Sequence, residues 1–308
     1  MEVLVPAIRR RDGVGERRLP FMSLKRAFRA SNIRVRLLVG LMLAVLFCIQ
    51  CTRSDAFRVH PLVKQVSGLP AAGVRPQQLR KLERLARTDH LALIDWALEH
   101  YRESYRDYTC TLVKQERIAG QLKTEQWIKV KYREQPFSVA MEWVKNAPIG
   151  DRVLYVEGKY NGQMLVRPAG LLYKLIGTQM RKPDGPEAMA NTLRPVTMFG
   201  FRRALESLRR VYALAASRGE GVCRFLGYRE VAGRYALALE RVLPPREDYP
   251  AKTTIWYLDT EWLVPLAIEG WDWDDRLTCS YLYRDVKFNV GLTDEDFTPE
   301  ANGMRLKR

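Results

Sequence analysis

The sequence predicts one α+β domain in which a curved antiparallel sheet of about ten strands packs helices on its concave side. Three observations predict this fold. Apolar residues recur at helical spacing before residue 107, they alternate with a period of two after it, and a second helical stretch interrupts the strands near residues 199–217. Strands in hairpin order, with helices before and between them, are typical of α+β proteins.

Two helices are expected at the start of the domain. Pro76 suits a first helical turn, and it is followed at helical spacing by Leu79, Leu82, Leu85 and Ala86. Thr88 or Asp89 caps a second helix, with a buried stripe of Leu91, Ile94, Leu98, Tyr101 and Tyr105. The preceding residues, 57–75, are interrupted by prolines and glycines and show no period. They are expected to be a linker to a domain at 76–308.

The strands are expected to follow from residue 107. WIKVKYR (127–133) and FSVAMEW (137–143) alternate apolar with polar or small residues, and Ala119-Gly120-Gln121 and Asn161-Gly162 are hairpin turns. Further strands are expected at 152–157, 163–167, 222–230, 234–242, 252–259, 264–271 and 277–290. A short helix near 186–190 and a longer one at 199–217, capped by Thr197, complete the domain.

Several strands are apolar on both faces, which predicts that the sheet curves around a helix, a ligand or both. An aromatic-rich core with helices inside the sheet would account for this pattern, and so would an apolar cleft for a lipid or acyl chain. Burying a 16-carbon chain offers on the order of 12 kcal/mol before ordering costs. The side chains expected to line the cleft are Val139, Met141, Trp143, Trp256, Leu258 and Tyr281. Lys114 and Glu116 would form either its polar rim or a cross-strand charge ladder.

Residues 1–56 form a basic leader. The apolar run 37–47 is shorter than the roughly 20 residues that span a bilayer, and Ser54 and Ala56 suit signal-peptidase cleavage after Ala56. The alternatives are a cleaved signal, an uncleaved anchor through residues 37–51, and a lipoprotein anchor, which the residues preceding Cys48 and Cys51 disfavour. Each places the domain in the periplasm or cell envelope, with membrane contact through the leader if it is uncleaved.

The chain carries a net charge of +16. Residues 1–36 hold ten Lys and Arg against three acidic residues, and residues 37–56 are neutral, so +9 belongs to residues 57–308. This charge is spread along the chain. It predicts a solvated basic surface or attraction to anionic lipid headgroups or anionic polymers. Because the chain is expected to be exported, no nucleic-acid partner is expected.

No enzyme, metal site or cofactor is expected. Cys110, Cys223 and Cys279 are an odd, scattered set that favours buried free thiols, with a Cys110–Cys279 bridge as the alternative. The three histidines precede the strands and share no metal-ligand spacing with these cysteines. The hydrolase, metalloprotease and nucleotide-binding motifs are absent from the sequence, so no catalytic residue is expected.

Four blocks carry a resemblance to a known family: DYTCTLVKQERIAGQL (107–122), KVKYREQPFSVAMEW (129–143), GDRVLYVEGKYNGQMLV (150–166) and PDGPEAMANTLRPVTMFGF (183–201). In order and spacing they resemble an exported bacterial family, domain of unknown function 1571. Where that family has a His before the Gly that follows the Asn-Gly hairpin, this chain has Arg167 and Pro168 in VRPAG. Any role of that His does not carry over.

The strand order is also similar to that of periplasmic lipoprotein carriers (LolA-like), whose half-open antiparallel barrel is lined with apolar side chains and covered by helices. The closing segment GLTDEDFTPEANGM (291–304) is similar to the end of that fold. The resemblance implies a non-enzymatic exported cell-envelope protein that binds a lipid, acyl chain or lipoprotein segment in an apolar cleft. The alternative is an envelope protein-interaction or sensor module without a stable ligand. The oligomeric state is left open.

Overall fold

The computed structural model describes residues 60–68 and 76–306. These belong to one compact unit that begins at His60. The expectations for the leader, its cleavage after Ala56 and an anchor at 37–51 lie outside the described residues. Within the described ranges, no helix combines the length and the apolar character needed to cross a bilayer.

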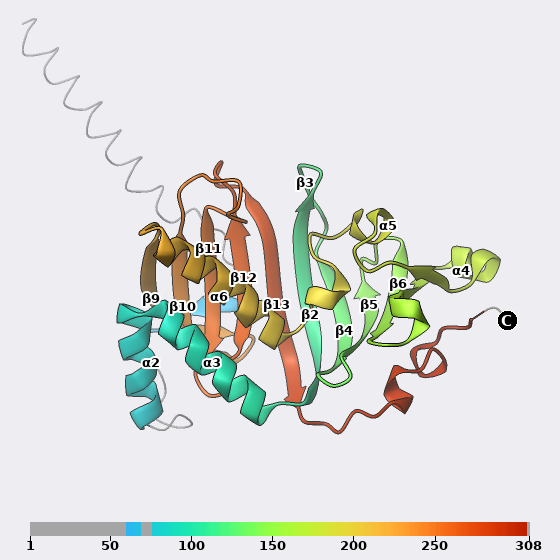
Figure 1. Ribbon diagram of the computed structural model, residues 1–308, viewed down its shortest axis with the longest axis horizontal. Helices are drawn as coiled ribbons and strands as arrows, with labels where there is room; N and C mark the ends of the chain where they lie inside the picture. The colour runs from blue at the N-terminus through green and yellow to red at the C-terminus, as the bar shows by residue number, and fades with distance from the viewer. Residues whose placement is uncertain (1–59, 69–75, 307–308) are drawn as a thin grey trace, which may run out of the picture. The chain divides into compact units, whose positions relative to one another are not determined.

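The unit is built on one antiparallel sheet of 13 strands that does not close (Figure 1). Its spatial order is β1-β9-β10-β11-β12-β13-β2-β4-β5-β6-β7-β8, and β3 pairs only with β2. The strands are β1 (Val63–Gln65), β2 (Asp107–Ile118), β3 (Gln121–Leu122), β4 (Gln126–Arg133), β5 (Ser138–Lys145), β6 (Gly150–Val156), β7 (Met164–Pro168), β8 (Gln179–Arg181), β9 (Val222–Val231), β10 (Arg234–Val242), β11 (Thr253–Asp259), β12 (Pro265–Trp271) and β13 (Leu277–Phe288).

The helices are α2 (Pro76–Thr88), α3 (His90–Ser104), α4 (Leu171–Ile176), α5 (Pro186–Met189) and α6 (Phe201–Ser217). Short 3-10 turns are η2 (Tyr160–Gly162), η3 (Val196–Met198), η4 (Glu295–Phe297) and η5 (Glu300–Asn302). The predicted α+β class, the open antiparallel sheet and its helices are therefore confirmed.

The sheet has three more strands than the ten expected. β1, β3 and β8 contain three, two and three residues, too few for a period of two to be visible in the sequence. β1 lies within the stretch 57–75 that was expected to be a linker. It pairs with β9, where Val63 is opposite Val231 and is buried.

The α3 cap is as predicted, whereas the α6 cap is not. The Asp89 side chain accepts a hydrogen bond from Ala92 N at 2.9 Å. The expected cap at Thr197 is wrong, because Thr197 lies in η3 and Gly200 occupies the cap position of α6. Gly200 has φ of 120°, and a Cβ there would lie 2.6 Å from the Tyr132 ring, so this close approach to the sheet requires glycine.

The inner face of the sheet is the face on which α6 packs. In one half, formed by β9–β13, α6 and α3 lie across this face (Figure 1). Trp256 of β11 donates its indole N–H to Tyr212 of α6 at 3.0 Å, and both side chains are buried. Near the centre of the sheet, Tyr108 stacks on Tyr132 and contacts Phe201, with ring centroids 4.6 Å and 4.8 Å apart. Helices thus cover the inner face of this half where Trp256 and Tyr212 meet.

The opposite, outer face of β5–β7 is covered by the C-terminal segment. Phe297 and Met304 pack with alternate residues of these strands and form a buried cluster with Ala140, Leu154, Val156 and Leu165. The residues that alternate with these on the same strands, such as Met141, Val153 and Met164, therefore face the inner side.

Candidate functional site

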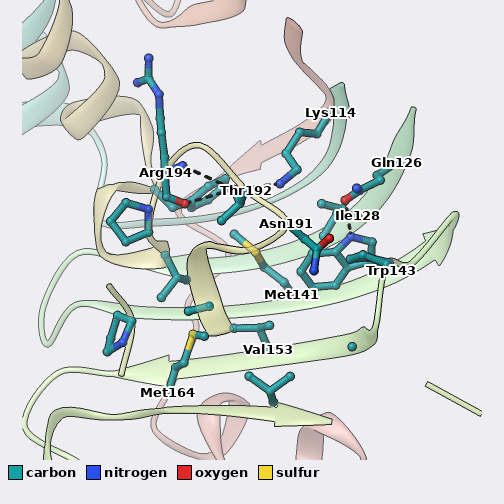
Figure 2. Close-up of a pocket in the computed structure, with 18 of the residues that line it drawn as sticks. Lys114, Gln126, Ile128, Met141, Trp143, Val153, Met164, Asn191, Thr192 and Arg194 are labelled. Carbon is teal, nitrogen blue, oxygen red and sulfur yellow. Dashed lines mark hydrogen bonds between the residues drawn. The ribbon is translucent and has the colours of Figure 1, made fainter. Parts of the chain in front are cut away.

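A cavity of about 400 Å³ lies on the inner face of the other half of the sheet. Its floor comes from β2 and β4–β7, with contributions from β12 and β13, and residues 183–200 lie over it with Asn191, Thr192 and Arg194 (Figure 2). The edge strand β8 and α4 complete the lining. Residues 183–200 are called the covering segment below. A volume of several hundred Å³ is typical of small-molecule sites.

The covering segment does not form a long helix because prolines and glycines interrupt it. Pro183, Pro186 and Pro195 each remove a backbone donor, and the chain forms only α5 and η3 before Gly200 leads into α6. The segment therefore runs over the strands as irregular chain. A cavity is left between the covering segment and β4–β7, whereas α6 packs directly on the other half of the sheet.

The floor of the cavity is mostly apolar. Met141 and Trp143 of β5, Val153 of β6 and Met164 of β7 face the cavity, as does Ile128 of β4 (Figure 2). The Trp143 indole N–H donates to Gln126 Oε1 at 2.8 Å. Because this bond satisfies the only polar group of the indole, the ring presents an apolar surface to the cavity.

One polar cluster lies where β2 and β13 meet the covering segment. Lys114 Nζ is 3.0 Å from Glu116 Oε2, and these side chains are only 11% and 3% exposed. The Tyr281 hydroxyl donates to Glu116 Oε1 at 2.5 Å, and Lys114 donates to the Thr192 hydroxyl at 3.2 Å. Burial, first of all, and the charge of Glu116 raise the pKa of Tyr281 well above its ordinary value. The cluster is thus electrically neutral, and it ties the covering segment to the sheet.

The structure brings five of the eight expected site residues to this cavity and leaves three away from its lining. Met141, Trp143, Tyr281, Lys114 and Glu116 line it. Val139 shares their face but lies opposite Tyr132, where it is fully buried. Trp256 packs against α6, and Leu258, two residues along the same strand, is also fully buried. For Trp256, α6 occupies the space that this side chain was expected to line.

The short helix expected near 186–190 is α5, within the covering segment, but the sequence did not reveal that this segment and α4 cover a cavity. Asn191, Thr192 and Arg194 reach the cavity from irregular chain, and Leu172 and Ile176 reach it from a helix of only six residues. The helical turns in these stretches, α4, α5 and η3, are too short to give a periodic pattern. The apolar run LLYKLI (171–176) was the one signal in the sequence for a surface helix at this place. It forms α4, in which Leu171 is 74% exposed and Leu175 is 72% exposed.

Among the described residues, the histidines and cysteines lie apart from the cavity floor. His90 bonds the Ala86 carbonyl and the Tyr212 hydroxyl, and burial lowers its pKa. Cys110 and Cys279 are buried free thiols, whereas Cys223 is exposed, so the expectation of burial is wrong for Cys223. Over residues 60–68 and 76–306, no three His, Cys, Asp or Glu side chains group closely enough to hold a metal ion.

The sequence that forms the cavity also matches a known protein family. Residues 105–305 match the model of the family described as "Protein of unknown function (DUF1571)". The chain belongs to this family. The resemblance seen in the four sequence blocks is thus confirmed, and the match includes β2–β13 and the covering segment. No curated protein sequence matches the chain.

Solved structures similar to this chain include three proteins. The MucA/MucB complex of Pseudomonas aeruginosa is 14% identical with a TM-score of 0.43, and the match covers 70% of this chain and 62% of that one. The lipoprotein LppX of Mycobacterium tuberculosis is 10% identical with a TM-score of 0.39, covering 66% and 96%. A LolA superfamily protein of Nitrosomonas europaea is 10% identical with a TM-score of 0.29, covering 67% and 98%. Similarity at this level transfers no ligand to this chain.

Proposed function

We propose that this protein is a non-enzymatic, exported cell-envelope protein that holds a lipid, an acyl chain or a lipoprotein segment in the cavity. One observation carries the proposal: a cavity of about 400 Å³ has an apolar floor, and the covering segment above it is hydrogen-bonded to the sheet through Thr192 and Lys114. The basic leader with its apolar run and small residues before position 57 supports export.

The lining chemistry suits a hydrocarbon ligand better than a polar one. Met141 and Met164 are flexible and polarisable, so they adapt to chains of different shape, and Trp143 offers a broad apolar ring. Each CH₂ group transferred from water contributes about 0.8 kcal/mol. Lys114 and Glu116 neutralise each other, so they are poorly placed to act as an acid or base on a substrate.

A second candidate is an envelope interaction or sensor module without a stable ligand. The observation that favours it is the exposure of Leu171 and Leu175 on α4, at the margin of the cavity. Contiguous exposed apolar side chains are typical of contact surfaces. The two candidates differ in what an intact chain carries when it is purified, and the experiment below separates them.

The test is native mass spectrometry with organic extraction of the chain, expressed with its leader. We expect a lipid or fatty-acid mass bound to the wild type and lost in Met141→Glu, which places a charge on the cavity floor. Val144→Glu is the matched control, because Val144 lies on the same strand and is 49% exposed. A wild type that carries no lipid, and takes up none from added vesicles, would refute the proposal in favour of the interaction module.

A further inference from the structure

A second cavity, of about 420 Å³, adjoins the first on the inner face of the sheet. The two cavities share Arg194, Ala204 and Ile268 as lining residues. The second cavity lies beside α6, which contributes Ser207, and it reaches Arg241 of β10. The first cavity has acidic side chains in its lining, Glu116 and Glu187. The lining of the second includes Arg117, Arg194 and Arg241 and, among the described residues, no acidic side chain.

Arg241 is a buried cation without a counter-ion in the part of the chain that the structure describes. It is only 2% exposed, and Nη2 donates to the Thr254 hydroxyl at 3.0 Å. Its guanidinium also lies 4.8 Å from the Tyr212 ring centroid. Nε and Nη1 have no hydrogen-bond partner among the described residues, and no described carboxylate pairs with the side chain. Burying a charge in this way is costly unless something neutralises it.

The strand register shows why no carboxylate of the sheet reaches Arg241. Directly opposed residues form one row across five strands, in the order Arg241, Thr254, Gly270, Cys279 and Glu116. Four strand spacings separate the ends of this row, about 19 Å at roughly 4.8 Å each. Glu116 is already engaged by Lys114 and Tyr281. The three residues between the ends are small, so they leave space above the sheet beside Arg241.

Arg194 adds a second positive charge at the junction of the cavities. Its guanidinium points away from Met164 and Trp143 (Figure 2) and lies 5.5 Å from the Tyr281 ring centroid. The charge of Arg241 is costly where it stands, since burial lowers its pKa. A charge maintained at such a cost is typical of a binding site, where the missing partner arrives with the ligand.

We propose that the second cavity binds the oxyanion head of a single-chain amphiphile, a carboxylate or a phosphate, on Arg241, while the acyl chain lies in the first cavity. This inference rests on the proposed function, because it assigns the two ends of the ligand to adjoining cavities. A guanidinium donates two parallel hydrogen bonds to either oxyanion. Arg194 lies on the path between head and tail and contributes long-range attraction.

The test compares dodecanoate with dodecanol, which have chains of equal length and differ in the charge of the head. Binding to the delipidated chain is followed by tryptophan fluorescence at pH 8, because Trp143 lines the first cavity. We expect the wild type to bind dodecanoate at least tenfold more tightly than dodecanol. Arg241→Met should reduce this preference to about onefold while leaving dodecanol binding intact. Arg209→Met is the matched control, because Arg209 lies on α6 but pairs with Asp95 at the surface.

Each other outcome has a distinct meaning. Equal binding of dodecanoate and dodecanol by the wild type overturns the head-group site and leaves the proposed function standing. Binding of neither overturns both. Inorganic phosphate that binds through Arg241 without displacing dodecanoate overturns the link between the cavities. If Arg241→Met does not fold, Arg194→Met on the covering segment is expected to weaken the preference at least threefold, and an unchanged preference overturns the inference.

Discussion

Replacing Lys114 by Met should destabilise the domain strongly at neutral pH. The substitution keeps a side chain of similar length but leaves the Glu116 carboxylate, which is 3% exposed, without its ammonium partner. At 3.0 Å and an effective dielectric constant near 20, the lost attraction is about 5.5 kcal/mol as an upper bound. Removing one partner of a buried pair typically costs about 3–5 kcal/mol, and we expect a loss in this range.

Urea denaturation followed by far-UV circular dichroism measures this loss. The double variant Lys114→Met/Glu116→Gln should recover most of it, because replacing both charges leaves nothing unpaired and often costs little. A single-variant loss below about 1 kcal/mol would refute the reasoning, since water would then have to solvate the carboxylate inside the cavity.

Three further predictions concern the frame of the site. Gly200→Ala should lower the free energy of unfolding in urea by about 2–4 kcal/mol, because the new Cβ is held at positive φ and clashes with Tyr132. Gly158→Ala is also at positive φ but would have no atom within 4 Å, so it should cost only about 1–2 kcal/mol, and equal losses would exclude the clash. Burial raises the pKa of Glu269, so the stability that its carboxyl contributes is complete below the unfolded-state pKa of about 4.3 and declines as pH rises through the folded-state pKa. Thermal melts at stepped pH should show a smaller decline of Tm in Glu269→Gln, and an unchanged dependence of Tm on pH would contradict this. In native peptide mapping Cys223 should react with a thiol reagent while the two buried cysteines react only after unfolding, and early labelling of those two would show that the inner face opens.

Periodicity predicted the long elements because their burial repeats over several turns or residues. α2, α3, α6 and ten strands were found in this way, and the short strands β1, β3 and β8 were not. A period of two cannot tell that Trp143 lines a cavity while Trp256 packs against a helix, because each alternates with the same kind of apolar residue along its strand. Their environments differ only because α6 covers one half of the sheet and the covering segment bridges the other.

One signal in the sequence could have revealed the second cavity. In RYALALERV (234–242) Arg241 stands in phase with Leu237 and Leu239, which are both fully buried. A cation on the apolar phase of a strand must find a partner or a ligand inside. Its register against Thr254, Gly270 and Cys279 depends on three hairpins and bulges, which no local pattern specifies.

The placement of β2 beside β13 has a consequence for how the protein is made. The hydrogen bond between Glu116 and Tyr281 joins residues 165 positions apart, and β2 and β13 form the seam between the two halves of the sheet. Chains dominated by such distant pairings fold slowly. During synthesis β2 therefore waits, with one edge unpaired, until residues 277–288 have been produced. For that interval the unpaired edge of β2 can pair with the edge strand of another chain, so this topology exposes the protein to aggregation until β13 is in place.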